Sequence, residues 1–348
     1  MKKILFAALA ALAITSCTQN EEIEAPSQKS EMKFNTAVSK TSRATALENK
    51  DFQAFKAYAY NHTNAWASAE SFNAFFSNID YSTTDKTNWI GKDASNATQT
   101  FYWPTTDYVS FFAYSVATMN DVTAWSGATT TSTPTFKYTV KTGIDKQEDL
   151  VVAELIDKKK ASSGETEAVS LNFKHALTKI SFDIKCVGVG LEYTVNSIKI
   201  NAKGTGVYKY KATGTSDTSL GEWTTEGENI AYTISLDADD KTMNGSDDNA
   251  VTKSLSSTPK YTAMLIPQAL TGISIEVNYK ATLNGALICD KESASETIDL
   301  SSSTATWESG KSIVYTLKLK GAEKMDISGT VTDAWDSNGA EELPKDPS

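Results

Sequence analysis

The hydrophobic and polar positions of the chain alternate in many short segments, and the first of these stands apart. Met32, Phe34, Thr36 and Val38 are each separated by one other residue. A period of two places these four side chains on one face of a β-strand. Polar sequence lies on both sides of residues 32–39, so the strand has no hairpin partner next to it. We therefore predict an isolated N-terminal strand that packs on a distant core.

The rest of the chain is rich in threonine, serine, tyrosine, valine and isoleucine, and its alternating runs are separated by polar turns. No stretch of twelve or more residues keeps a helical period, apart from a turn or two at 68–76. This pattern predicts an all-β fold built as a sandwich or barrel. We expect strands at 54–60, 99–103, 108–114, 135–140, 149–155, 168–173, 177–187, 193–201, 206–210, 230–236, 261–266, 273–283, 286–289, 296–300 and 312–320.

The length of the chain suggests two β domains after the N-terminal strand. The residues that follow Arg43 number 305, too many for one typical small β domain. The charged loop at 157–167 contains Ser-Ser-Gly and is the expected boundary. We therefore expect one domain over residues 44–160 and a second over 161–348. The second should bury apolar side chains of the run 168–187, among them Phe173, Ile180, Phe182 and Ile184.

A segment near the end of the chain repeats the pattern of the first strand. Met325, Ile327, Val331 and Trp335 fall on one face of a period-two segment, and Gly329 lies between them. A glycine weakens a strand and can mark a bulge. The polar, proline-containing sequence after Trp335 should fray.

The first residues predict export and lipidation. Residues 1–3 are positive, and an eleven-residue apolar run at 4–14 has the length of a signal-peptide core, too short to span a bilayer. Ile14-Thr15-Ser16-Cys17 then has the form of a lipobox. We predict a lipoprotein signal peptide at 1–16 and lipid on Cys17, with several acyl chains giving a stable anchor. An ordinary secretory signal with an incidental cysteine is the alternative.

Residues 17–43 would then form a tether and a removable strand. The polar stretch 18–31 has almost no apolar content and should be a disordered tether. Its acidic residues resemble the surface-export signal of some Gram-negative lipoproteins, which would place the protein on the outer face of the outer membrane.

Arg43 is the only arginine of the chain, since the other 32 basic side chains are lysine. An arginine-specific protease would have one site, between Arg43 and Ala44. A cut there would separate the N-terminal strand from everything that follows. A genome that disfavours arginine codons is the alternative explanation for this composition.

The composition contains few histidine and cysteine residues that could bind a metal ion or catalyse a reaction. The net charge of −10 argues against nucleic acid as a partner. Two histidines and no Cys-x-x-Cys predict no metal site and no cofactor, and no catalytic residues emerge. His175 is interpreted as a packing or hydrogen-bonding residue. Cys186 and Cys289 could form a disulfide or remain two buried thiols.

An acidic loop and three tryptophans could each have either a structural or a ligand-binding role. The acidic loop 237–249 could hold Ca²⁺, but its spacing does not match the EF-hand, so a solvated hairpin loop is preferred. Trp66, Trp89 and Trp125 lie in polar stretches and are the candidates for stacking on a sugar ring if a glycan site exists.

Several segments in order resemble one family, the fimbrillins, which are subunits of type V pili. Besides the lipobox and Ser42-Arg43, the resemblance rests on these segments: Tyr102-Trp103-Pro104, Val109-Ser110-Phe111-Phe112-Ala113-Tyr114, Gln147-Glu148-Asp149-Leu150-Val151, Leu171-Asn172-Phe173-Lys174-His175-Ala176-Leu177-Thr178-Lys179-Ile180, Leu265-Ile266-Pro267-Gln268 and Trp307-Glu308-Ser309-Gly310-Lys311.

The resemblance implies two transthyretin-like β-sandwich domains, lipoprotein export and arginine-specific processing at the cell surface. It also implies that processing removes the first strand and that a strand of a neighbouring subunit fills the groove. The donor strand residues would be Met32, Phe34 and Val38 before cleavage, and Met325, Ile327 and Val331 afterwards. A sandwich that lacks one strand is in any case a template for strand addition.

We therefore expect a non-enzymatic fimbrial subunit. Its partners would be other fimbrial subunits and, before processing, the outer membrane through the lipid. A monomeric surface lipoprotein adhesin that binds a host glycan or protein receptor is the alternative. A glycan-active enzyme would need a pair of carboxylates that the sequence does not reveal.

Overall fold

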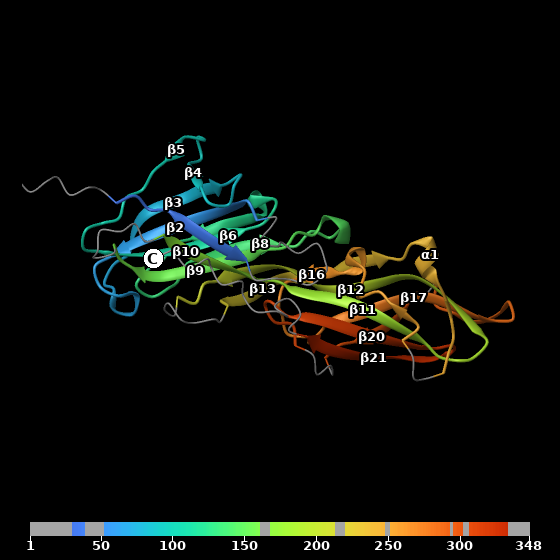
Figure 1. Cartoon of the computed structure of the whole chain (residues 1–348). Helices are drawn as coiled ribbons and strands as arrows, with labels where there is room; N and C mark the ends of the chain where they lie inside the picture. Colours follow the sequence, from blue (N-terminus) through green and yellow to red (C-terminus); the bar gives the residue numbers. More distant parts are fainter. Residues whose placement is uncertain are drawn as a thin grey trace, which may run out of the picture.

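The computed structural model describes residues 30–38, 52–160, 168–212, 220–247, 251–292, 295–301 and 306–332. This part of the chain is built almost entirely of β-strands, as the sequence predicts. The molecule is elongated: one half contains β2, β3, β6, β9 and β10, and the other contains β11, β12, β17, β20 and β21 (Figure 1).

The first sheet occupies the N-terminal half. Its strand order is β1-β10-β9-β6-β2-β3-β4-β5, and β1 pairs with β10 in parallel, whereas the other neighbours are antiparallel. The strands are β1 (Phe34–Val38), β2 (Ala54–His62), β3 (Asn73–Ser82), β4 (Ile90–Lys92), β5 (Thr98–Gln99), β6 (Tyr108–Ser115), β9 (Val151–Lys158) and β10 (Val169–His175).

Two further sheets lie mainly in the other half. The second sheet has the order β15-β11-β20-β21, with β16 also on β11. Its strands are β11 (Thr178–Cys186), β15 (Lys253–Ser254), β16 (Ala263–Leu265), β20 (Ser312–Lys320) and β21 (Glu323–Thr332).

The third sheet has the order β18-β17-β12-β8-β7, with β13 and β14 also on β12 and β19 on β17. Its strands are β7 (Val122–Ser126), β8 (Thr135–Thr139), β12 (Leu191–Lys209), β13 (Glu222–Ser235), β14 (Thr242–Asn244), β17 (Ser274–Leu283), β18 (Ala286–Asp290) and β19 (Glu296–Asp299). Short helical turns occur at η1 (Trp66–Ser68), η2 (Met119–Asp121), η3 (Ile144–Lys146), α1 (Ala238–Lys241) and η4 (Pro259–Tyr261).

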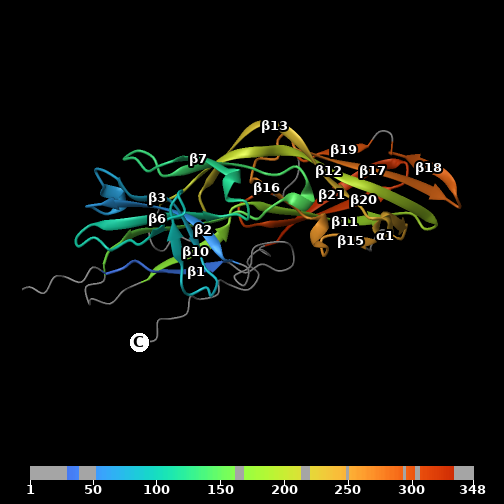
Figure 2. The same ribbon diagram turned by 90° about the horizontal axis from the view of Figure 1, so that it is seen from above.

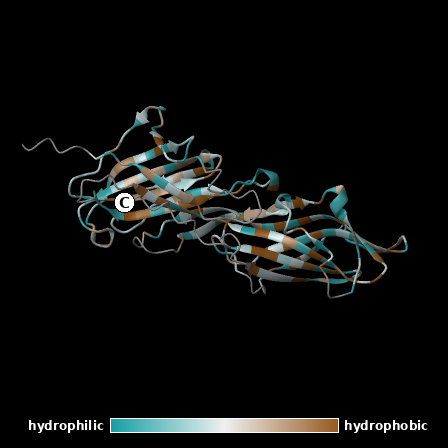
Figure 3. Cartoon of the chain, viewed as in Figure 1, coloured by the Kyte–Doolittle hydropathy of each residue, from teal (hydrophilic) through white to brown (hydrophobic). Residues whose placement is uncertain are grey.

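Two cores explain the apolar patterns of the strands. The inner face of the first sheet closes on a core that includes Phe55, Phe111 and Phe173. The opposite face of β2 and β6 packs against the third sheet, so these strands are buried on both faces. This explains why their sequences are nearly continuous apolar runs. The second and third sheets enclose the other core, and their strands alternate between apolar and polar residues (Figure 3).

Strand pairing crosses the position at which the sequence suggested a domain boundary. Residues 161–167 lie outside the described part, but β10 directly after them pairs with β9 directly before them. Conversely, β7 and β8 precede that position and join the third sheet through β12. A division at residue 160 would therefore separate paired strands. Phe173 belongs to the core of the first sheet, whereas Ile180, Phe182 and Ile184 lie in the other core, and all four are fully buried.

Several local predictions need correction. The turn or two of helix expected at 68–76 is absent, because β3 begins at Asn73 and the only helical turn nearby is η1. The strands expected at 193–201 and 206–210 form one strand, β12. The run 99–103 contributes a strand only at β5. Within the described residues, no helix is long and apolar enough to cross a membrane.

Candidate functional site

The candidate site is the position that the N-terminal segment, residues 30–38, occupies in the first sheet. On one side β1 pairs with β10 from Phe34↔Val169 to Val38↔Phe173, and the two strands lie side by side in Figure 2. On the other side the segment is bonded to residues 101–103. The Met32 amide donates to the Phe101 carbonyl at 2.8 Å. We call the space between β10 and residues 101–103 the slot.

Backbone bonds at the entrance of the slot continue this pattern. The Trp103 amide donates to the Ser30 carbonyl at 2.9 Å, and the Val169 amide donates to the Lys33 carbonyl at 2.7 Å. Residues 30–32 are thus bonded to residues 101–103 on one edge of the segment. From Lys33 onward, the segment is bonded to β10 on its other edge.

Three apolar side chains of the segment complete the core. Met32, Phe34 and Val38 are 6%, 3% and 1% exposed. Burying side chains of this size is worth about 1.5–3 kcal/mol each. The apolar residues of the alternating pattern therefore form the buried face of the segment. Lys33 and Asn35, which lie between them, are exposed.

Phe34 sits in a pocket made of aromatic rings. Its ring centroid lies 4.5 Å from that of Tyr81, 5.7 Å from Phe55 and 5.9 Å from Phe111. Tyr81 is buried, and its burial raises the pKa of the phenol well above its usual range. We call this space the Phe34 pocket.

The predicted processing residues lie beside this segment in the chain. Arg43 and Ala44 fall within residues 39–51, which link β1 to Phe52 and lie outside the described residues, as does Cys17. Since β1 precedes this link, a cut within it separates β1 covalently from every other strand.

The second set of predicted donor residues lies in β21. This strand pairs antiparallel with β20 and forms the edge of the second sheet among the described residues. Met325 is buried, Ile327 is half-buried, and Val331 is 41% exposed. Trp335 lies outside the described residues. The structure therefore does not bring Met325, Ile327 and Val331 together with Met32, Phe34 and Val38 within one chain.

The start of β21 is fixed by a buried carboxylate. Glu296 Oε1 accepts a hydrogen bond from the Met325 amide at 2.5 Å, and Glu296 Oε2 accepts one from the Tyr279 hydroxyl at 2.9 Å. Glu296 is 9% exposed. No feature of the sequence pointed to this contact, because the two residues are distant in the chain.

The remaining polar candidates have structural roles. His175 is buried, and its Nδ1 lies 2.7 Å from Asp149 Oδ2, in agreement with its interpretation as a hydrogen-bonding residue. Cys186 and Cys289 are buried and free. Burial raises the pKa of the Cys186 thiol to about 12. The loop around 237 contains α1 rather than a plain hairpin turn.

The three tryptophans considered for sugar binding pack on the protein itself. Trp125 stacks on Tyr58 with ring centroids 3.6 Å apart. Trp66 packs against Phe72, and Trp89 packs against Phe55. Each ring therefore already covers an aromatic neighbour.

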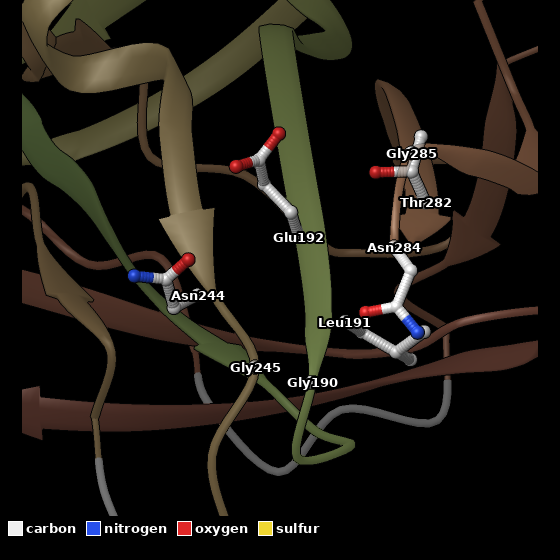
Figure 4. A pocket seen from close by; sticks show the side chains of 8 residues that line it. All are labelled: Gly190, Leu191, Glu192, Asn244, Gly245, Thr282, Asn284 and Gly285. Carbon is white, nitrogen blue, oxygen red and sulfur yellow. The ribbon is translucent and has the colours of Figure 1, made fainter.

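A pocket lies beside the start of β12 and the ends of β14 and β17, and Figure 4 shows the residues that line it. It is lined by Leu191, Glu192, Asn244 and Asn284 together with glycines and a threonine. Glu192 is the one charged residue that lines it. In the described part of the chain, no group of three or more histidine, cysteine or acidic residues could hold a metal ion.

The fold and the slot define a class of protein: an all-β protein whose N-terminal segment completes its core as a border strand. A family model described as fimbrillin-like matches residues 41–335. The chain therefore belongs to the fimbrillin-like family, which indicates a fimbrial subunit or an adhesion role at a cell-surface appendage.

A solved structure shares the fold, and a second resembles the chain over a similar length. A fimbrial protein from Bacteroides vulgatus ATCC 8482 is 18% identical, with 87% of this chain and 99% of that chain covered at a TM-score of 0.53. A candidate cell adhesion protein from Bacteroides uniformis ATCC 8492 is 19% identical, with 87% and 98% covered at a TM-score of 0.47. No curated protein matches the chain.

Proposed function

We propose that the protein is a structural subunit of a surface fimbria that polymerises by strand exchange and supports adhesion. In this proposal it is exported as a lipoprotein through Cys17 to the outer membrane surface and is cut between Arg43 and Ala44. The observation that carries the proposal is the packing of the N-terminal segment. Its Met32, Phe34 and Val38 complete the core, although its covalent connection to the other strands runs only through residues 39–51.

The covalent link explains how the cut would act as a switch. While the link is intact, the segment has a high effective concentration at the slot, so a strand from another molecule cannot easily compete. After the cut this advantage is lost, and the segment can leave together with the lipidated tether. The emptied slot would expose the backbone of β10 and the Phe34 pocket, which is a template for an added strand.

The neighbour's strand is proposed to be β21, with Met325, Ile327 and Val331 as its apolar side chains. Among the described residues this strand is at the edge of its sheet, so its departure would break one ladder of backbone bonds, the hydrogen bond from the Met325 amide to Glu296 and the burial of Met325. Membership of the fimbrillin-like family supports assembly with other fimbrial subunits.

The test is limited digestion of the full chain with an arginine-specific protease, followed by sizing in mild detergent. We expect the wild type to form ladders after the cut. Arg43→Ala should fold and stay monomeric, and Lys40→Ala, which keeps the only arginine, should behave as the wild type. Ladders formed by Arg43→Ala, or a cut wild type that stays monomeric at high concentration, would contradict the proposal.

A further inference from the structure

We infer that the pocket lined by Glu192, Asn244, Thr282 and Asn284 binds a neutral saccharide through hydrogen bonds to its hydroxyl groups (Figure 4). We call it the Glu192 pocket. Its volume of about 520 Å³ is within the range of sites that hold small ligands. The inference goes beyond the proposed function, because it depends on neither the cut after Arg43 nor the exchange of strands.

Strand pairing places three polar side chains in a row across the outer face of the third sheet. Glu192 of β12 lies opposite Asn244 of β14 on one side and opposite Thr282 of β17 on the other. Residues that lie opposite each other in a ladder point to the same face of a sheet. Tyr193 and Met243, which follow and precede members of the row, are buried in the core, so the row itself faces outward.

A tight turn holds Asn284 at one end of the pocket. Asn284 and Gly285 join β17 to β18, and their φ angles are 49° and 82°. A two-residue hairpin turn with positive φ at both positions is the type I′ turn, which favours Asn-Gly. The backbone of Asn284 is therefore fixed before a ligand arrives, so little conformational freedom is lost on binding. Figure 4 shows the Glu192 side chain between those of Asn244 and Asn284.

An exposed leucine extends the polar row at the edge of the sheet. Leu287 of β18 lies opposite Thr282 and is 58% exposed. Since neighbouring strands are 4.7–4.9 Å apart, the row from Asn244 to Leu287 spans about 14 Å, which is more than one sugar ring covers. A sugar ring carries apolar C–H groups beside its hydroxyls, and covering them with a leucine side chain is favourable.

The polar side chains of the pocket keep their capacity for hydrogen bonds. Among the described residues, no hydrogen bond or ion pair within the protein engages the side chains of Glu192, Asn244, Thr282 and Asn284. The contrast is Glu276, on the same face of β17, whose carboxylate binds Lys199 and Asn201. The pocket therefore presents a carboxylate, two amides and a hydroxyl that a ligand can engage.

This set of groups matches sugar hydroxyls. Amide side chains and the threonine hydroxyl both donate and accept hydrogen bonds, and the Glu192 carboxylate accepts them. A sugar hydroxyl also donates and accepts, so every group of the pocket finds a counterpart. A basic peptide would use Glu192 but leave the amide N–H groups without acceptors.

Ionic ligands fit less well. No cationic residue lines the pocket, and the nearby Lys280 lies 3.5 Å from Glu292, so an anionic ligand finds no free counter-charge. Calcium takes six to eight oxygen ligands, commonly with several carboxylates, and Glu192 is the one carboxylate here.

The experiment screens the uncut, full-length chain on an array of neutral, sialylated and sulfated oligosaccharides, with a lysine-rich peptide as a further probe. The neutral oligosaccharide that binds most strongly is then titrated in solution by calorimetry, with and without a chelator of divalent cations. We expect neutral oligosaccharides to bind and the chelator to leave their affinity unchanged.

Two variants connect binding to the pocket. Glu192→Gln keeps the size of the side chain and removes its charge, and it should weaken binding about tenfold, because a charged acceptor forms the stronger hydrogen bond. Asn244→Ala should weaken binding as well. The matched control is Glu222→Gln, the same change at an exposed glutamate of β13 outside the pocket, which should bind as the wild type does. These residues are exposed, so all three variants should keep the denaturation midpoint.

Hydrogen exchange gives a readout without any substitution. The bound oligosaccharide should slow exchange in peptides that cover residues 242–246 and 281–287, and leave β10 unchanged.

Binding only to the sialylated, sulfated or lysine-rich probes would overturn the ligand class. Three results would refute the site: no binding of neutral oligosaccharides, equal binding by the wild type and both pocket variants, or loss of binding with the chelator. Ladder formation after the cut tests the proposed function separately, so either proposal can fail without the other.

Discussion

The contribution of the Phe34 side chain to docking of the N-terminal segment can be worked out from its surroundings. Replacing Phe34 by alanine removes a ring that is 3% exposed and that contacts Tyr81, Phe55 and Phe111. Changes of this kind typically cost 3–5 kcal/mol, and three aromatic neighbours place the cost near the middle of that range, at about 4 kcal/mol. The equilibrium for undocking of the segment should then rise by roughly a factor of a thousand.

The loss of docking free energy should affect the N-terminal segment and its neighbour β10 rather than the whole molecule. The segment lies at the border of the first sheet, so it can detach while the other strands stay paired, and local opening of this kind has its own free energy. Hydrogen exchange of the uncut full chain, read by mass spectrometry, should show faster exchange in peptides that cover β10. Peptides from β11 and β20 should keep the exchange rates of the wild type.

The matched control is Asn35→Ala, which changes the exposed neighbour of Phe34 in the same strand. This variant should exchange as the wild type does, and Phe34→Leu should fall between the two. If β10 exchanges equally fast in Phe34→Ala and in the wild type, the N-terminal segment does not depend on the Phe34 pocket and the reasoning is wrong.

Three further predictions concern anchoring, the core and a buried thiol. Cys17→Ser should lose lipidation and membrane retention, and incorporation of a labelled fatty acid by this variant would contradict the lipobox interpretation. Phe182→Ala should lower the free energy of unfolding by about 3–5 kcal/mol, because Phe182 is fully buried beside Tyr315. Denaturant titration measures this free energy, and Lys185→Ala is the control. Cys186, with its pKa raised to about 12, should resist alkylation at pH 8 until the protein is unfolded, as peptide mass mapping would show.

The sequence predicted most strands because period-two alternation is a local property. It also predicted the face of the N-terminal segment that is buried, since Met32, Phe34 and Val38 are apolar at every second position. It did not predict the strand that pairs with this segment, because β10 lies more than 130 residues further along the chain. Pairing between such distant strands leaves no local pattern.

Two glycines lie in the one long strand that we predicted as two. We predicted separate strands at 193–201 and 206–210, yet β12 continues through Gly204 and Gly206. A side chain at Gly204 would collide with the Tyr232 hydroxyl, and one at Gly206 would crowd the Thr224 carbonyl. Glycine is therefore required there by the close approach of β13, where the pairing also contains a bulge. That requirement is visible only once β13 is in place.

The positions of the two border strands account for why the chain could form a polymer rather than a closed dimer. β1 borders the first sheet and β21 borders the second, so one copy can accept a strand in the slot without disturbing the strand that it donates. Under the proposed function, the surface that accepts and the surface that donates are different parts of the molecule. Contacts between two different surfaces are heterologous, and they continue from copy to copy unless the rotation closes a ring. The arrangement of border strands in separate sheets therefore favours a filament as the product of a single cut.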